Sequence, residues 1–115
     1  MKLSTYYGGV QTGEFWGVGF YRQGRWYLSY KMACGKLSRT IKVKESDLSY
    51  FHVKGSCEEG RWRLQISQND LKRDIQFSGL VDEVIDMSDF DGGLIKMVLL
   101  LESVRNVNAV ISCEK

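Results

Sequence analysis

Two tyrosines and several basic residues lie close together in the amino-terminal third of the chain and carry its clearest binding chemistry. Tyr21 and Tyr27 flank a glycine-containing turn, and Arg25 and Lys31 follow on the same stretch. Aromatic rings supply rigid contact area and basic side chains supply donors and charge, which is the chemistry of recognition rather than of catalysis. The candidate partner-binding residues are Tyr21, Arg22, Arg25, Tyr27, Lys31 and Lys36.

Catalytic and metal-binding chemistry has few candidates. The chain has one histidine, His52, and three scattered cysteines, Cys34, Cys57 and Cys113. The cysteines lack the paired Cys-x-x-Cys spacing of a structural zinc site, and no local motif joins His52 to a nucleophile. We therefore expect no enzymatic activity, no metal and no cofactor.

An acidic segment between residues 82 and 91 is the other candidate for a metal site. Its acids are Asp82, Glu83, Asp86, Asp89 and Asp91. Aligned as a calcium-binding loop, the segment would place Met87 and Val98 at the first and twelfth positions, which require oxygen ligands. A solvated charged segment is the better interpretation.

The charge is unevenly distributed along a chain of 115 residues whose net charge is only +2. Residues 15–44 contain seven basic residues and no acid, whereas residues 70–115 contain nine acids and five bases. This pattern predicts a bipolar molecule. No linker divides the chain, so a single domain spanning 1–115 is expected.

The cysteine usage and the start of the chain bear on the compartment. An odd number of scattered cysteines does not form a disulfide framework, and the first residues are not an apolar signal segment. The longest strongly apolar run, residues 97–101, is too short to cross a bilayer. The sequence therefore favours a cytoplasmic protein without a membrane span.

Alternation of apolar and polar residues predicts the elements that position these side chains. It marks two strands within 15–32, then strands at 37–43, 50–54, 62–67 and 75–78, and a paired tail of 94–102 with 107–113 through an Arg105-Asn106 turn. The segment 94–102 is equally compatible with a buried helix. Helical spacing of Val81, Val84 and Ile85 predicts one short helix over Leu80–Met87.

The register of the first hairpin decides which residues are in the core. A two-residue Gln23-Gly24 loop would pair Phe20 with Tyr27 and separate the two apolar rows, whereas a three-residue loop beginning at Arg22 would unite them. We expect the three-residue loop. The predicted core is Trp16, Val18, Phe20, Trp26, Leu28, Tyr30, Ile41, Val43, Trp62, Leu64, Ile66, Ile75, Phe77, Val98 and Leu100.

These observations predict a mainly β fold, a single small antiparallel β-barrel or sandwich of six to eight strands with one short helix. Small size, bipolar charge and exposed aromatic residues favour a non-enzymatic protein that binds a protein partner and inhibits or modulates it, in the manner of immunity proteins or phage inhibitors. The alternative is a single-stranded nucleic-acid-binding β-barrel, which would use the same rings and cations for bases and phosphates. The sequence does not determine the oligomeric state.

Overall fold

In a computed structural model, the described part of the chain forms one antiparallel sheet of five strands. The structure describes residues 4–22, 24–44 and 49–114, with residues 4–12 described by their backbone alone. The strands are β1 (Ser4–Arg22), β2 (Arg25–Val43), β3 (Tyr50–Gln68), β4 (Leu71–Asp86) and β5 (Gly93–Glu114). Their order across the sheet is β1-β2-β5-β3-β4, so the last strand in sequence is the central one. Among these residues no helix is long and apolar enough to cross a membrane.

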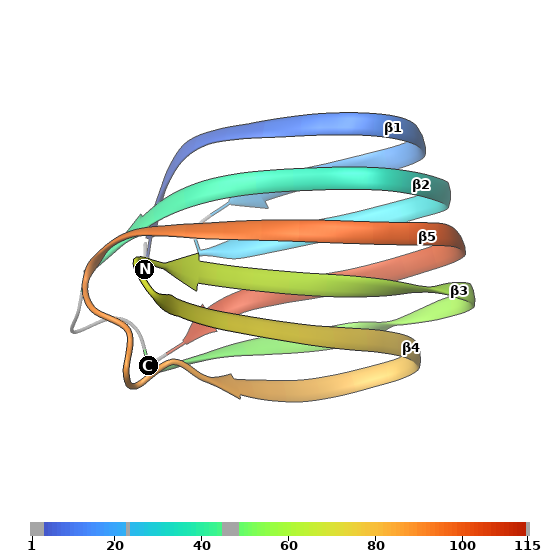
Figure 1. The fold of residues 1–115 in the computed structure, drawn as a ribbon. Helices are drawn as coiled ribbons and strands as arrows, with labels where there is room; N and C mark the ends of the chain where they lie inside the picture. The colour runs from blue at the N-terminus through green and yellow to red at the C-terminus, as the bar shows by residue number, and fades with distance from the viewer. Residues whose placement is uncertain (1–3, 23, 45–48, 115) are drawn as a thin grey trace.

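The sheet is folded over on itself. A straight strand of 19 residues would be about 63 Å long at about 3.3 Å per residue, but the longest dimension of the molecule is 36 Å. All five strands turn at the same side of the molecule, so each contributes one limb to each of two layers (Figure 1). We call the layer in front in Figure 1 layer A; its described side chains come from residues 36–43, 61–68, 71–78 and 93–101. Layer B contains residues 14–22, 25–32, 50–58, 80–86 and 104–114.

The turn of each strand is marked by a residue with positive φ. These residues are Gly13 (118°), Gly35 (151°), Gly60 (84°), Gly79 (64°) and Ser103 (46°). Left-handed backbone and β-bulges both bend a strand, and glycine adopts such a conformation at least cost. The register is interrupted in the same region of β2 and β3. The line of bends therefore separates the two layers.

Large apolar side chains fill the space between the layers. Trp26 and Phe51 from layer B and Trp62, Leu64 and Ile41 from layer A are each less than 2% exposed. Trp62 also contacts Phe77, with ring centroids 4.5 Å apart. The limbs of β2, β3, β4 and β5 thus bury residues against the opposite layer.

The prediction of a mainly β, antiparallel fold is confirmed, but its details need correction. There are five strands in one open sheet rather than six to eight. In β2 and β3 the alternation of buried and exposed residues changes phase at the bend, so one bent strand has the pattern of two. The tail is likewise a single strand: segments 94–102 and 107–113 belong to different layers and do not pair with each other.

The predicted helix at Leu80–Met87 is also wrong. Residues 80–86 complete β4, with Leu80 paired to Ser56 and Ile85 paired to Phe51. Val81 and Ile85 are buried while Val84 is 62% exposed. A separation of four residues satisfies both the strand period and the helix period, and the spacing was therefore ambiguous.

The first hairpin has the two-residue loop, between Arg22 and Arg25, and not the expected three-residue loop. Arg22 pairs with Arg25 and Phe20 with Tyr27. Consequently Trp16, Val18 and Phe20, which were expected in the core, are 64%, 61% and 46% exposed. Of the other expected core residues, Ile75 and Leu100 are half-buried, and the remainder are buried.

Candidate functional site

A row of apolar rings faces solvent on the outside of layer B. Trp16, Val18 and Phe20 follow one another on β1, and Tyr27 lies on β2 directly opposite Phe20. The rings of Phe20 and Tyr27 are stacked, with centroids 4.8 Å apart and an interplanar angle of 21°. Exposed apolar side chains gathered in this way are typical of a binding surface. We define the aromatic face as Trp16, Val18, Phe20, Tyr27, Ser29, Lys31, Asn106 and Asn108.

Two glycines explain why this row faces outward. Gly17 and Gly19 alternate with the large exposed residues of β1; the Tyr30 side chain occupies the space beside Gly19, and the backbone of Ser29 and Tyr30 lies against Gly17. A Cβ on Gly19 would lie 2.2 Å from the Tyr30 hydroxyl, and a Cβ on Gly17 would lie 2.2 Å from the Ser29 carbonyl oxygen. Larger residues at these positions would clash, so the glycines belong inside and the aromatic residues outside.

A groove with largely apolar walls and polar side chains at its edge borders Trp16. The volume of this groove is about 540 Å³. Its lining includes Trp16 and Val18 of β1, Ser29 and Lys31 of β2, and Asn106 and Asn108 of β5. Ser29 Oγ donates a hydrogen bond of 2.9 Å to Asn108 Oδ1, which fixes the amide while directing its nitrogen elsewhere. Asn106 Nδ2 donates to Glu58. The groove therefore presents amide, hydroxyl and ammonium groups beside an exposed indole.

The structure divides the six candidate residues predicted from the sequence among three places. Arg22, Arg25, Tyr27 and Lys31 lie on the outside of layer B, where Tyr27 and Lys31 belong to the aromatic face. Tyr21 points inward and packs against the core, and burial raises the pKa of its hydroxyl. Lys36 lies beyond the bend, on layer A.

Six residues of the aromatic face were not among the predicted candidates: Trp16, Val18, Phe20, Ser29, Asn106 and Asn108. Trp16 was assigned to the core through the wrong hairpin register. The two-residue loop would have placed it outside, and the glycines at 17 and 19 favour that register. Asn106 and Asn108 had no recognisable signal, because they reach the face only through the central position of β5.

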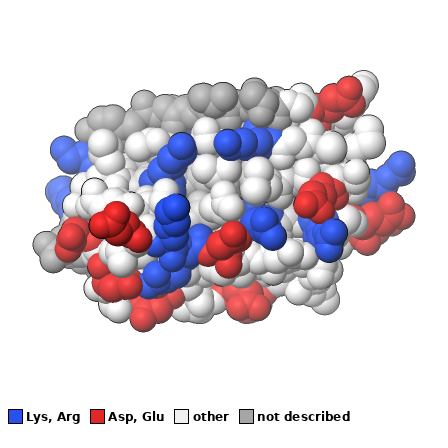
Figure 2. Space-filling view, in the orientation of Figure 1, with Lys and Arg blue, Asp and Glu red and all other residues white. Residues whose placement is uncertain are grey.

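The outside of layer A has a different character. Basic side chains form a band across this face in Figure 2, and no aromatic ring lies on it within the described part of the chain. The basic residues of β2 are therefore divided by the bend, with Arg25 and Lys31 on layer B and Lys36 and Lys42 on layer A. The basic and acidic stretches of the sequence therefore do not form a basic half and an acidic half of the molecular surface.

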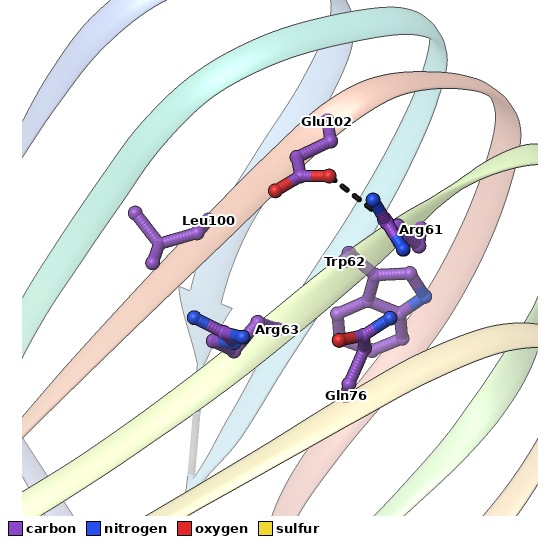
Figure 3. A pocket seen from close by; sticks show the side chains of 6 residues that line it. All are labelled: Arg61, Trp62, Arg63, Gln76, Leu100 and Glu102. Carbon is purple, nitrogen blue, oxygen red and sulfur yellow. Dashed lines mark hydrogen bonds and ion pairs between the residues drawn. The ribbon is translucent and has the colours of Figure 1, made fainter.

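A small hollow on layer A carries two arginines (Figure 3). Arg61 points toward Glu102, and its Nε donates to the carboxylate at 2.8 Å. Arg63 Nε lies 3.2 Å from Asp74 Oδ1. The hollow holds about 20 Å³, room for about one water molecule. Because its charges are already paired, it is a weaker candidate than the aromatic face.

The groups with catalytic potential are engaged in local contacts. His52 hydrogen-bonds to Asp82 across β3 and β4, and this bond lowers the pKa of the Asp82 carboxyl. Burial raises the pKa of the Cys57 thiol, which donates to the Glu59 carbonyl at 3.0 Å. Within the described ranges no three His, Cys, Asp or Glu residues gather as a metal site. Cys34, Cys57 and Cys113 are all free thiols.

Comparison with known proteins relates this chain to others by fold alone. No family model matches the sequence, and no curated protein matches it. Among solved structures the chain is similar to TmCBM61 in complex with β-1,4-galactotriose, with a TM-score of 0.51 and 11% identity over 95% of this chain and 87% of that one. A mutant carbohydrate-binding module of family 29 aligns with a TM-score of 0.42 and 12% identity over 92% and 89% of the two chains.

These similarities correct the function expected from the sequence. The match with a TM-score above 0.5, TmCBM61, is a carbohydrate-binding module in complex with an oligosaccharide. Neither an inhibitor or immunity protein directed at a protein partner nor a single-stranded nucleic-acid-binding barrel agrees with this finding. The fold of this chain is instead one that is found in a carbohydrate-binding module.

Proposed function

We propose that this chain is a non-catalytic carbohydrate-binding domain that takes a neutral oligosaccharide on its aromatic face. The observation that carries the proposal is Trp16, an indole that is 64% exposed at the border of a groove edged by polar side chains. A pyranose ring has an apolar face of C–H groups and a rim of hydroxyls. It is thus complementary to a flat ring beside hydrogen-bonding side chains.

The positions of the rings favour a chain of sugars over a single one. Trp16 and Phe20 are four residues apart on one strand, which places them about 13 Å apart at about 3.3 Å per residue. The stacked Phe20 and Tyr27 pair provides a second apolar platform at that distance. A saccharide of several units can therefore contact both platforms along β1.

The polar residues of the groove match the hydroxyl rim. Asn108 accepts from Ser29 and retains its amide hydrogens, and Lys31 forms no ion pair within the described part of the chain. Hydroxyl groups of a saccharide can accept from both. Binding without catalysis agrees with the position of the hydrogen-bonded pair His52 and Asp82. His52 lies on β3, which is three strand positions, about 14 Å, from β1, the strand that carries Trp16.

The test is isothermal titration calorimetry with β-1,4-galactotriose and a panel of other neutral oligosaccharides. We expect at least one to bind, and we expect Trp16→Ala to weaken that binding by about 30-fold, as for a central interface residue worth about 2 kcal/mol. Leu80→Ala is the matched control, since Leu80 is 89% exposed on β4 and lies outside the aromatic face. Absence of binding across the panel, or equal loss in both variants, would refute the proposal.

A further inference from the structure

Lys36, Lys72 and Lys96 are among the lysines of layer A that form no ion pair within the described part of the chain. Of the cations on this side, Arg61 pairs with Glu102, Arg63 with Asp74, and Arg73 binds both oxygens of Asp89 at 2.6 and 2.7 Å. These pairs neutralise Glu102, Asp74 and Asp89. Lys36, Lys72 and Lys96 are all exposed.

The same three lysines border a groove. It has a volume of about 270 Å³, and Gln65, Ser67, Arg73 and Asp74 are the other polar side chains that line it. Asp74 is matched by Arg63, and it also accepts from Gln65 Nε2 at 3.3 Å. The groove therefore combines uncompensated positive charge with neutral hydrogen-bonding groups.

The sheet register sets the spacing of the lysines. Ser67 pairs with Lys72 on one side and with Lys96 on the other, so these two lysines are two strands, about 10 Å, apart. Lys96 pairs with Thr40, and Lys36 lies four residues, about 13 Å, further along β2. One small anion does not need cations so far apart, whereas a chain with repeated anionic groups does.

We propose that this groove, defined with its lysines as the basic face, is a second binding site that takes a saccharide chain bearing repeated carboxylate or sulfate groups. The lysines meet the anionic groups, and Ser67 and Gln65 meet hydroxyls between them. Single-stranded nucleic acid fits less well, because its binding sites combine cations with stacking rings and the basic face has no aromatic ring among the described residues.

The test measures binding of polygalacturonate and of dextran sulfate, with methyl-esterified polygalacturonate and dextran as the neutral counterparts. We expect one or both polyanions to bind, and the affinity to fall steeply as the salt concentration rises. The triple variant Lys36→Gln, Lys72→Gln, Lys96→Gln should weaken this binding at least tenfold. Lys54→Gln, the same change on the other layer, should leave it unchanged.

Three outcomes would overturn the proposal: no binding of either polyanion, equal binding of the neutral counterparts, or equal or tighter binding of an oligothymidylate at the same salt concentration. Circular dichroism and thermal melting establish that the triple variant is folded. Trp16→Ala should not alter polyanion binding, and the triple variant should not alter neutral oligosaccharide binding. The two sites can therefore succeed or fail separately.

Discussion

The aromatic face and the basic face share the strands β2 and β5, but aromatic rings dominate the first and lysines the second. β2 and β5 cross both layers, and each supplies residues to both faces. On layer B the exposed groups are rings with amide and hydroxyl neighbours, and on layer A they are lysines and paired arginines. The inward residues are apolar on both layers. The folded sheet therefore fixes what is buried and leaves each outer face free to acquire its own chemistry.

The largest expected effect tests which tryptophans belong to the core. Trp62→Ala removes a ring that is 1% exposed and contacts Phe77, so it should lower the free energy of unfolding by about 3–5 kcal/mol. Trp16→Ala should change it by less than about 1 kcal/mol, since that ring faces solvent. Urea denaturation measures both. A loss at Trp16 as large as at Trp62 would mean that the aromatic face is covered.

The second prediction concerns the bend that separates the faces. Gly60→Ala should destabilise the protein by more than about 2 kcal/mol, because the residue has a φ of 84° and a Cβ would lie 2.6 Å from two backbone carbonyl oxygens. Gly79→Ala should cost only about 1–2 kcal/mol, since φ is 64° but nothing lies within 4 Å. Thermal melting compares the pair. Equal losses would show that backbone conformation alone, without crowding, sets the bend.

A smaller effect is expected from the polar side of the aromatic face. Asn108→Ala removes one amide and should weaken neutral oligosaccharide binding threefold to tenfold, about 0.5–1.5 kcal/mol for a hydrogen bond. Calorimetry with the ligand identified for the wild type measures the change. Ser112→Ala, also on β5 but outside the groove, is the control. Unchanged affinity in Asn108→Ala would mean that the aromatic rings bind the oligosaccharide without a contribution from the Asn108 amide.

The smallest expected effect concerns the pair formed by His52 and Asp82, which lies outside the aromatic face. His52 lowers the pKa of Asp82 in the folded protein, so the stability from this pair is present above the ordinary carboxyl pKa of about 3.9 and is lost as the pH falls through the lower folded value. Asp82→Asn should therefore be slightly less stable than the wild type near pH 6 and equal to it near pH 2. Urea midpoints across that range test this. Oligosaccharide affinity should not change.

Sequence patterns predicted the class of the fold but not its connectivity. Alternation in Trp26–Leu28–Tyr30 and in Trp62–Leu64–Ile66 correctly indicated strands with one buried face. The bends were not apparent, because a glycine with positive φ inside a continuous strand gives the same signal as a turn between two strands. One residue of loop length then reversed the face of Trp16. Asn108 lies in the site only because β5 pairs with β2, and a local sequence pattern does not indicate such a long-range pairing.

The central position of β5 has a consequence for how the chain reaches this structure. β1 with β2 and β3 with β4 are neighbours in sequence, so each pair can form as a hairpin early and independently. β5 is the last of the five strands to be synthesised, and until it arrives both β2 and β3 present an unpaired edge of 19 residues. Such edges recruit other chains. We therefore expect folding of this protein to be rate-limited by insertion of β5 between the two hairpins, and aggregation to compete with that step through the edges of β2 and β3.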